Sequence, residues 1–293
     1  MPNIKVSAII PTFNSWFSLK YSIDSLYKQT LKISEIIVVD NASSDDTVKN
    51  VKKIFPKIKL VKIKKNTGVT GGRNAGIEAS NKDSQYLLFF DHDMVADKKM
   101  LEDLIRVGES NYNFGILTPK IFYFENKKRV WAAGTNINLW TGQVLFRGGM
   151  DHGQFENIEE VQVAPAVILV KREVIKRINK FDERYFATYE DTDFCFRARR
   201  FNFKTVYVPK AIAFHKISPF PKDEKKRLLS RSFWIGRNRV LFMRDFGRNF
   251  FLFLLFSPVY LLYFIKMSLE EKDLKSLLRY IKGYITGILE VSR

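Results

Sequence analysis

Three carboxylates crowd one short stretch of the sequence. The segment YFATYEDTDFCFRARRF, residues 185–201, holds Glu190, Asp191 and Asp193 within four positions, with aromatic residues on both sides. Like charges at this spacing repel one another, and burial raises the free energy of each ionised carboxylate. These acids therefore either decorate the first turn of a helix or serve a site that offers positive charge or a proton to remove.

A second acidic motif follows an apolar run. Asp91, His92 and Asp93 come after QYLLFF, residues 85–90, and this run predicts a strand that ends in acid. Two carboxylates suit Mg²⁺ or Mn²⁺, because these cations bind through one or two carboxylates together with substrate phosphates. An isolated pair of this kind is also common as the polar end of a strand, so the motif needs support from other residues.

A glycine-rich turn has the features of an anion site. In NTGVTGGRNAG, residues 66–76, Gly68 and Gly72 let the backbone approach a ligand closely, and the helix that begins there offers free N–H groups. Arg73 adds a fixed positive charge. The turn has neither the GK[ST] ending of a P-loop nor the pattern GxGxxG. An ordinary turn with a helix cap is the alternative interpretation.

Two further polar residues stand at the ends of apolar runs. Asp40 ends IIVVD and could accept hydrogen bonds from a nucleobase or a ribose, although acids also simply terminate strands. His215 ends VYVPKAIAFH, and a neutral imidazole there suits a divalent metal. A lone histidine is more often structural, so neither residue carries an assignment by itself.

Strands and helices alternate over the first half of the chain, which predicts a mostly parallel sheet flanked by helices, an α/β fold. Ligands of such sheets bind beyond the carboxyl ends of the strands, where Asp40, Asp91 and Asp93 lie. Strand-like runs continue in the second half. The predicted strands cover 5–12, 34–40, 57–63, 85–94, 115–124, 161–170 and 204–215, and the helices of the first half cover 15–29, 47–55 and 66–80.

Together these motifs resemble the inverting family 2 glycosyltransferases, which bind a nucleotide-diphospho-sugar on the GT-A fold. The resemblance covers roughly residues 4–215 and rests on five blocks in the family's order. The third block is similar to that of rhamnosyltransferase-like and cell-surface glycan members. The blocks are SAIIPTFNSWFSLKYSIDSLYKQT, EIIVVDNASSDDT, NTGVTGGRNAGI, DHD and FDERYFATYEDTDFCFRARRFNFKTVYVPKAIAFH.

The resemblance implies a role for the crowded carboxylates. Asp191 would be the catalytic base that takes the proton from the acceptor hydroxyl as that oxygen attacks the anomeric carbon. Glu190 and Tyr189 would contact the acceptor. Asp193 is expected to be a structural acid in the first turn of the helix, where negative charge is favourable.

The resemblance also implies a metal and a donor site. Mg²⁺ or Mn²⁺ would be held by Asp93, with Asp91 near the metal or the ribose and His215 as a further ligand. His92 departs from the NPD or DDD pattern of many members. Phe13 would stack on the base, and Asp40 would read it. The full set expected to bind the nucleotide-sugar is Pro11, Thr12, Phe13, Asn14, Asp40, Gly68, Gly72, Arg73, Asn74, Asp91 and His92.

Composition narrows the class of protein further. The 293 residues carry a net charge of +18 and a single cysteine, Cys195, which excludes an internal disulfide and a cysteine-rich metal site. The N-terminal residues lack the charged-then-apolar layout of a signal peptide and are expected to form a strand directly. A basic chain can meet nucleic acid, but no helix-turn-helix, zinc-finger or RNA-binding motif is present, so we expect no nucleic-acid partner.

The last quarter of the chain differs from the rest. Residues 216–293 contain 16 lysines and arginines against 7 acids, which leaves +9, half of the total excess. A basic amphipathic helix is predicted over 227–246, followed by an apolar run of 16 residues over 250–265. This run is shorter than the roughly 20 residues that a spanning helix needs, so we expect it to lie in the membrane interface and to carry none of the chemistry. The alternative is a helical appendage packed on the catalytic domain or on a second subunit.

We therefore expect a metal-dependent, inverting hexosyl- or deoxyhexosyltransferase at the cytoplasmic face of the cell membrane. The donor would be UDP-, dTDP- or GDP-linked, and the acceptor a hydroxyl of a glycan or a lipid-linked molecule. Residues 1–215 would form the catalytic domain, with a donor half (1–115) and an acceptor half (116–215), and residues 216–293 a membrane-associating extension. The alternatives are a nucleotidyltransferase and an inactive membrane-bound sugar-binding scaffold, and a homo-oligomer is a possible assembly.

Overall fold

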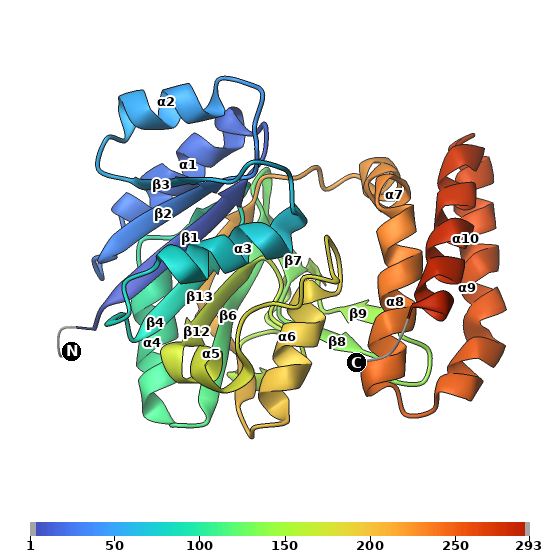
Figure 1. Cartoon of the computed structure of the whole chain (residues 1–293). Helices are drawn as coiled ribbons and strands as arrows, with labels where there is room; N and C mark the ends of the chain where they lie inside the picture. Colours follow the sequence, from blue (N-terminus) through green and yellow to red (C-terminus); the bar gives the residue numbers. More distant parts are fainter. Residues whose placement is uncertain (1–3, 291–293) are drawn as a thin grey trace.

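Buried apolar strands form a central sheet, and helices cover both of its faces (Figure 1). In the computed structural model, which describes residues 4–290, side chains of the first strand alternate between two cores, as a pleated strand requires. Val6, Ala8 and Ile10 pack into one core, and Ile9 packs into the other. The sheet therefore separates two layers of helices.

The strands are short except for two near the middle of the sheet. They are β1 (Val6–Thr12), β2 (Glu35–Asp40), β3 (Lys59–Lys62), β4 (Tyr86–Phe90), β5 (Met94–Ala96), β6 (Phe114–Tyr123), β7 (Asn126–Ala132), β8 (Thr135–Ile137), β9 (Val144–Phe146), β10 (Gly149–Met150), β11 (Glu159–Val161), β12 (Val167–Lys171) and β13 (Lys204–His215).

The α/β body of the chain is followed by a purely helical C-terminal part, and the helices of both are given in chain order. They are α1 (Trp16–Tyr27), α2 (Thr47–Ile54), α3 (Gly68–Ala79), α4 (Met100–Ser110), α5 (Arg172–Ile178), α6 (Glu190–Arg199), α7 (Pro221–Ser230), α8 (Ser232–Phe246), α9 (Phe250–Glu270) and α10 (Leu274–Leu289).

The first half of the sheet is parallel, as the sequence predicts, and the second half is mixed. Strands β3, β2, β1 and β4 pair in parallel in that order. Strand β12 then pairs antiparallel with both β4 and β6, and β13 runs parallel to β6. The predicted division between residues 115 and 116 falls inside β6, so the donor and acceptor halves share one sheet.

This topology brings the candidate residues to one edge. Strands β1, β2, β4, β6 and β13 point in the same direction, so their carboxyl ends meet. Asp40 ends β2, Asp91 follows β4, and His215 ends β13. Because β5 pairs antiparallel with β13, with Met94 opposite His215, Asp93 is placed directly beside the histidine.

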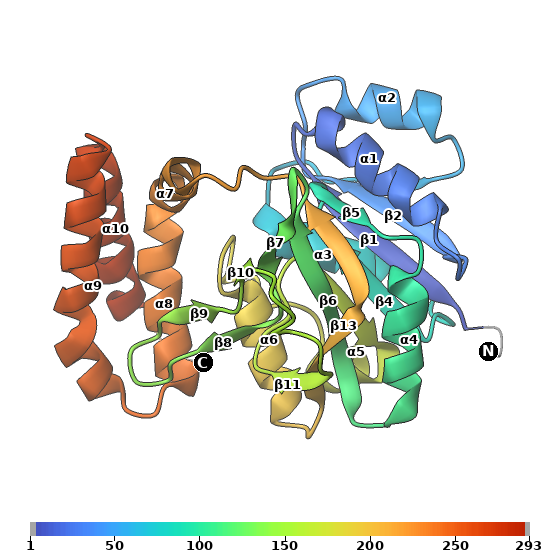
Figure 2. The ribbon, with the colours of Figure 1, turned by 180° about the vertical axis from the view of Figure 1, so that it is seen from behind.

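Residues after His215 form a bundle of helices beside the α/β body. Figures 1 and 2 show α8 on the side of this bundle that faces the body, with α9 and α10 on the far side. The predicted basic helix over 227–246 is in fact two helices, because the chain breaks at Arg231 between α7 and α8. Close packing joins α8 to α10: a Cβ on Gly283 would lie 2.0 Å from the carbonyl oxygen of Phe233.

The apolar run predicted over 250–265 belongs to a longer helix than expected. α9 extends to Glu270, and its 21 residues would span about 32 Å at ~1.5 Å per residue. Among the helices described, it alone has the length and composition to cross a membrane, with a mean hydropathy of 1.9 in its most apolar window. One side of α9 packs on the bundle, where Phe264 stacks on Tyr280 of α10 at 4.0 Å between ring centroids.

Candidate active site

A cavity of about 250 Å³ opens at the carboxyl edge of the sheet. It is bounded by the ends of β1 and β4, the start of α3, where the glycines of the motif lie, and the loop that leads into α6. Of the residues predicted from the sequence, eight line it: Pro11, Thr12, Phe13, Gly68, Asp91, His92, Asp93 and Glu190. The ring of Phe13 is 43 % exposed, so it offers an open face to a planar ligand.

Seven further residues line the cavity. Their backbone or side chains complete the walls between the glycine-rich turn, the loop before α6 and the helical bundle. They are Asn41, Asn66, Val69, Phe186, Ala187, Thr188 and Arg231. Asn41 and Asn66 lie beside predicted residues in the sequence, so adjacency alone could have suggested them, whereas Arg231 lies outside the region that the motifs cover.

The two acids of the DHD motif have different partners. Oδ2 of Asp93 lies 3.2 Å from Nε2 of His215, and the ring of Trp131 packs edge-on against the imidazole. Oδ1 of Asp91 accepts a hydrogen bond from Arg73 at 3.0 Å. Asp93 and His215 are therefore together as predicted, while Asp91 is turned toward a buried arginine.

The Asp93–His215 pair fits a divalent cation. Burial raises the pKa of Asp93, but the facing His215 and the nearby His92 lower it, and the net pKa lies well below the usual range. Nδ1 of His215 is buried and has no hydrogen-bond partner. In the described part of the chain no three His, Cys, Asp or Glu side chains gather into a metal site. Two protein ligands are sufficient where substrate phosphates supply the others.

Arg73 joins the two acidic motifs. Its side chain is fully buried, and its guanidinium contacts Asp91, Asp191 and Glu190, the last at 3.8 Å. Burial would lower the pKa of Arg73, but the three carboxylates raise it above its ordinary value, so the residue is a permanent cation. The crowded carboxylates are tolerated because this charge lies among them.

The first turn of α6 holds the acid pair, of which Glu190 lines the cavity and Asp191, bonded to Arg73, does not. Burial raises the pKa of Glu190 to about 8, and the Asp191 carboxylate adds to this effect while Arg73 opposes it. Burial also raises the pKa of Asp191, again against Arg73. Asp193 instead accepts a hydrogen bond from Arg197 at 2.7 Å one turn along α6, a structural contact as the sequence predicts.

Tyr189 does not fit the acceptor-binding role predicted for it. Its side chain is buried, and its hydroxyl donates a hydrogen bond to the carbonyl of Gly142 at 2.5 Å. Burial raises the pKa of this phenol, so it stays protonated. The ring packs on Phe242 of α8 and supports the loop from behind, which leaves no face for a sugar.

Several predicted nucleotide-binding residues instead shape the backbone. The amide of Asn74 is buried and exchanges hydrogen bonds with the backbone of Phe181. Asp40 is buried and accepts from the N–H of Ser43, and Asn14 accepts from the N–H of Ser44. Asp40 and Asn14 thus hold the turn beside the cavity, and neither lines it.

The glycine-rich turn supports the cavity by close packing. A Cβ on Gly72 would lie 2.8 Å from Cβ of Pro11, so this glycine lets α3 approach β1. Gly68 has a φ of +72° and lies against the carbonyl of Phe186, which accepts a hydrogen bond from the N–H of Val69 at 3.1 Å. The N–H of Val69 at the start of α3, which the sequence suggests is free for an anion, is therefore already used.

Arg231 is the one lysine or arginine that lines the cavity. It stands at the break between α7 and α8 and is exposed. Within residues 4–290, no hydrogen bond or ion pair engages its guanidinium. The acids that face it across the cavity, Asp91, Asp93 and Glu190, are all held by other groups. Arg231 is therefore available to an anionic ligand.

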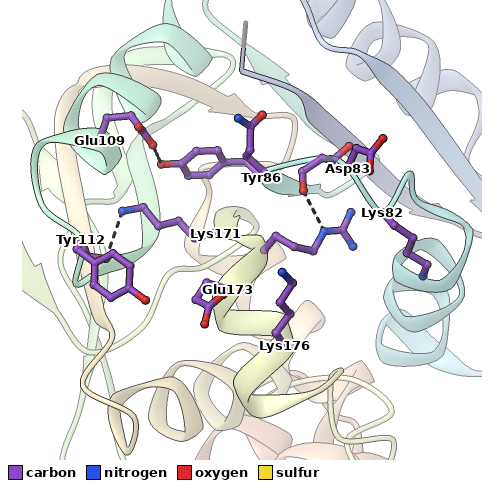
Figure 3. A pocket seen from close by; sticks show the side chains of 11 residues that line it. Lys82, Asp83, Tyr86, Glu109, Tyr112, Lys171, Glu173 and Lys176 are labelled. Carbon is purple, nitrogen blue, oxygen red and sulfur yellow. Dashed lines mark hydrogen bonds between the residues drawn. The ribbon is translucent and has the colours of Figure 1, made fainter. Parts of the chain in front are cut away.

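A larger cavity of about 500 Å³ lies at the opposite edge of the sheet, between the start of β4 and α5 (Figure 3). Its arginine, Arg172, donates to the carbonyls of Ser84 and Asn81 and to Ser80, and one of its three lysines, Lys171, donates to backbone carbonyls. None of the residues predicted to do chemistry lines it. The smaller cavity, which the acidic motifs line, is therefore the candidate active site.

Solved structures share this architecture, which is the GT-A fold. Staphylococcus aureus TarS 1-349 in complex with UDP superposes with a TM-score of 0.56 and 20 % identity over 83 % of this chain and 70 % of that one. GalNAc-T7 with UDP, GalNAc and Mn²⁺ gives 0.60 and 14 % over 81 % of this chain and 51 % of that one. These similarities establish the fold.

The chain belongs to glycosyl transferase family 2, whose model matches residues 7–179. It is 27 % identical over 248 residues to the amylovoran biosynthesis glycosyltransferase AmsB of Erwinia amylovora, over 80 % of this chain and 78 % of that protein. It is 28 % identical over 209 residues to the poly(ribitol-phosphate) β-N-acetylglucosaminyltransferase TarP of Staphylococcus aureus, over 69 % of this chain and 61 % of that protein.

Proposed function

We propose that this family 2 glycosyltransferase is metal-dependent and inverting, and moves a sugar from a nucleoside-diphospho-sugar to a hydroxyl of a glycan or lipid-linked acceptor. The main support for the proposal is the position of Asp191, whose carboxylate is held by Arg73. The same guanidinium contacts Asp191 and Asp91 of the DHD motif, so the acid pair and the donor cavity are held in one fixed geometry.

Asp191 acts as the base in this proposal. Its carboxylate removes the proton from the acceptor hydroxyl while that oxygen attacks the anomeric carbon in a single displacement. Arg73 fixes the carboxylate and balances part of its charge. The raised pKa of Asp191 makes it a better proton acceptor once it is ionised, because the buried carboxylate is less stable than one in water.

Asp93 and His215 would hold the divalent cation, Mg²⁺ or Mn²⁺. When bound, such a cation neutralises the charge of a nucleoside diphosphate as it leaves. Arg231 would contribute a second positive charge to the same diphosphate, because its guanidinium lines the cavity and is free of other partners. The exposed ring of Phe13 would stack on the base of a UDP-, dTDP- or GDP-linked donor.

We also propose that the outer face of the bundle lies on the cytoplasmic membrane surface. Eight large apolar side chains of α9 are at least 38 % exposed: Phe251, Leu252, Leu255, Phe256, Val259, Leu262, Tyr263 and Leu269. Such a patch is rare on a monomeric soluble protein. The net charge of +9 over residues 216–293 would favour anionic lipid.

An interfacial position fits α9 better than a spanning one. Its inner side is held along its length, by Arg239 over the ring of Tyr260 at 3.3 Å and by a 2.7 Å hydrogen bond between Ser257 and Tyr284. Crossing the bilayer would require α9 to leave α8 and α10, because the arginines of α8 could not accompany it into hydrocarbon. The packed helix can bury its exposed face in the interface without rearrangement.

The nucleotidyltransferase alternative has less support. It requires basic groups in the glycine-rich turn to clamp phosphates, and Arg73 is the turn's only arginine or lysine. That guanidinium is buried against three carboxylates and faces no cavity. The remaining alternative, an inactive sugar-binding scaffold, would release no nucleoside diphosphate from a nucleotide-sugar, so an activity assay distinguishes it from an enzyme.

The test is release of nucleoside diphosphate from a panel of UDP-, dTDP- and GDP-sugars, with Mn²⁺ or Mg²⁺ and with excess EDTA. We expect metal-dependent release for one class of base, and its loss in EDTA and in Asp93→Ala. Asp191→Asn should lower sugar transfer by about 10²–10⁴-fold while nucleotide binding is retained, because only the proton acceptor is removed. Full activity in EDTA would refute the metal, and wild-type transfer by Asp191→Asn would refute the base.

A further inference from the structure

The loop that leads into α6 has an unusual backbone. Thr188 and Tyr189 have φ values of +66° and +64°, so two consecutive non-glycine residues adopt the left-handed conformation directly before Glu190. This conformation is unfavourable for any residue that has a Cβ. A conformation of this kind persists only where its surroundings hold it.

The side-chain amide of Asn238 on α8 holds this loop. Its Nδ2 donates hydrogen bonds to the carbonyls of Ala187 at 2.8 Å and Thr188 at 3.0 Å. Its Oδ1 accepts from the guanidinium of Arg237 at 2.8 Å, which fixes the orientation of the amide. Asn238 is fully buried, so no water competes for these carbonyls.

Neighbouring residues of α8 extend this contact. The ring of Phe186 stacks on Trp234, with 4.8 Å between centroids and 15° between planes. Arg237 donates to the carbonyl of Arg184 at 2.7 Å. One face of α8 therefore holds the chain from residue 184 to residue 188, and three residues of this segment (186, 187 and 188) line the donor cavity.

We propose that Asn238 is a positioning residue for sugar transfer. By fixing the carbonyls of Ala187 and Thr188, its amide sets the direction in which α6 begins and so the position of Asp191 in its first turn. Asn238 itself does not line the cavity, so it acts only through the loop. This inference rests on the proposed role of Asp191, and it makes α8 of the helical bundle part of the catalytic machinery.

The first test compares an isosteric variant with a control on the same helix. In Asn238→Asp an ionised carboxylate still accepts from Arg237, but it cannot donate to the two loop carbonyls. Arg244→Gln is the control, because Arg244 bonds to the carbonyls of Gly287 and Ile288 in α10 and has no contact with the loop. Both variants lose hydrogen bonds that α8 makes to another segment, and only Asn238→Asp releases the loop.

We expect Asn238→Asp to lower kcat for transfer by about 10–100-fold, because small misplacements of a catalytic group are costly. The Kd for the nucleoside diphosphate should change less than threefold, and Arg244→Gln should keep kcat within about threefold of wild type. All rates are measured equally far below each protein's Tm. Hydrogen exchange in a peptide covering 183–192 should accelerate in Asn238→Asp and not in Arg244→Gln.

Three results would overturn the proposal. They are wild-type kcat in Asn238→Asp, an equal loss of kcat in both variants, or unchanged exchange in the loop. If Asn238→Asp does not fold, Asn238→Ala, which buries no charge, carries the same expectations. Wild-type protein without any transfer activity would refute the proposed function itself, whereas active wild type with an active Asn238→Asp variant would refute only the role of Asn238.

Discussion

At Glu190 and Asp191, burial and Arg73 act in opposite directions on two adjacent carboxyls. Burial dominates and raises the pKa of both groups. The site therefore contains one permanent cation and an acid pair that resists full ionisation. This balance explains how three carboxylates can stand within four positions: Asp193 pairs with Arg197, and the other two share Arg73.

A dependence of stability on pH follows from Glu190. Its pKa is about 8 in the folded protein, above the ordinary value of 4.5. Between pH 4.5 and pH 8 the folded state therefore keeps a proton on Glu190 that the unfolded state has lost. Stability should therefore fall as pH rises through this window, by roughly 1 kcal/mol per pH unit. Glu190→Gln removes this proton, and its free energy of unfolding should fall less between pH 6 and pH 8.

Urea unfolding of the metal-free protein at both pH values measures the difference. Lys82→Ala serves as a control, since Lys82 is exposed and distant from the acid pair. Equal pH dependence in wild type and Glu190→Gln would contradict the raised pKa.

Arg231 gives a second prediction at this scale. Removing it should weaken binding of a nucleoside diphosphate about tenfold. A charge-assisted hydrogen bond contributes roughly 1.5–3 kcal/mol, and exposure of Arg231 to solvent reduces this contribution. Lys226→Ala removes the same charge from an exposed position on α7 that does not line the cavity. Calorimetry with UDP, dTDP and GDP measures the effect. Equal affinities of Arg231→Ala and Lys226→Ala would mean that Arg231 makes no contact with the ligand.

At the scale of elements, the sequence predicts the first half of the fold well. Apolar β-branched runs coincide with β1, β2, β3 and β4, and the acids at their ends meet at one edge because parallel strands share a direction. The family motifs also predict that Asp93 and His215 share a site, and these two side chains lie 3.2 Å apart. Local pattern was sufficient in these cases because each residue sits at the end of a regular element.

The remaining parts of the site depend on contacts that local pattern does not encode. The sequence over 227–246 is helical in composition throughout, so nothing marks the break that brings Arg231 to the cavity. Tyr189 was predicted to face a sugar, but the left-handed backbone before α6 turns its side chain inward. Asn74 bonds to the backbone of Phe181, more than 100 residues further along the chain, whereas Asp40 bonds to the nearby N–H of Ser43 within its own turn.

The packing of α8 on α10 gives a prediction for these elements. A Cβ on Gly283 would lie 2.0 Å from the backbone oxygen of Phe233, so Gly283→Ala must separate the two helices. We expect a loss of about 1–3 kcal/mol of stability even though alanine favours a helix by about 1 kcal/mol. Lys282→Ala on the exposed side of α10 should change stability by less than about 0.5 kcal/mol. A Gly283→Ala protein as stable as wild type in urea would contradict the packing.

At the scale of the whole molecule, the apolar outer face and the active site belong to one rigid arrangement. α9 and α10 form the far side of the bundle, and α8 connects them to the loop before α6 (Figure 2). Deleting residues from Phe250 onward would therefore expose the buried side of α8 as well as remove the apolar face. Point substitutions on the outer face are a cleaner test of membrane binding.

We expect the full chain to float with liposomes that contain anionic lipid. The double variant Leu255→Asp with Leu262→Asp should not float, because these side chains are 70 % and 64 % exposed on α9. Phe17→Asp is the control, since Phe17 is 81 % exposed on α1 of the catalytic body and should not matter. High salt should weaken binding only partly, because apolar burial is not screened. The membrane proposal would be wrong if wild-type protein stayed at the bottom of the gradient. If that protein also formed a dimer that the double variant could not form, the apolar face would instead bind a second copy of the chain.

The stereochemistry of the reaction tests the central claim most directly. A single displacement with Asp191 as base inverts the anomeric carbon, so an α-linked nucleotide donor must give a β-linked product or, with water as acceptor, the β-sugar first. Time-resolved proton NMR of the anomeric signal during turnover of the active donor measures this before mutarotation mixes the forms. We expect the wild-type protein to invert the anomeric carbon, and we expect Asp191→Asn to lose turnover. Retained configuration, or undiminished turnover in that variant, would contradict the central claim.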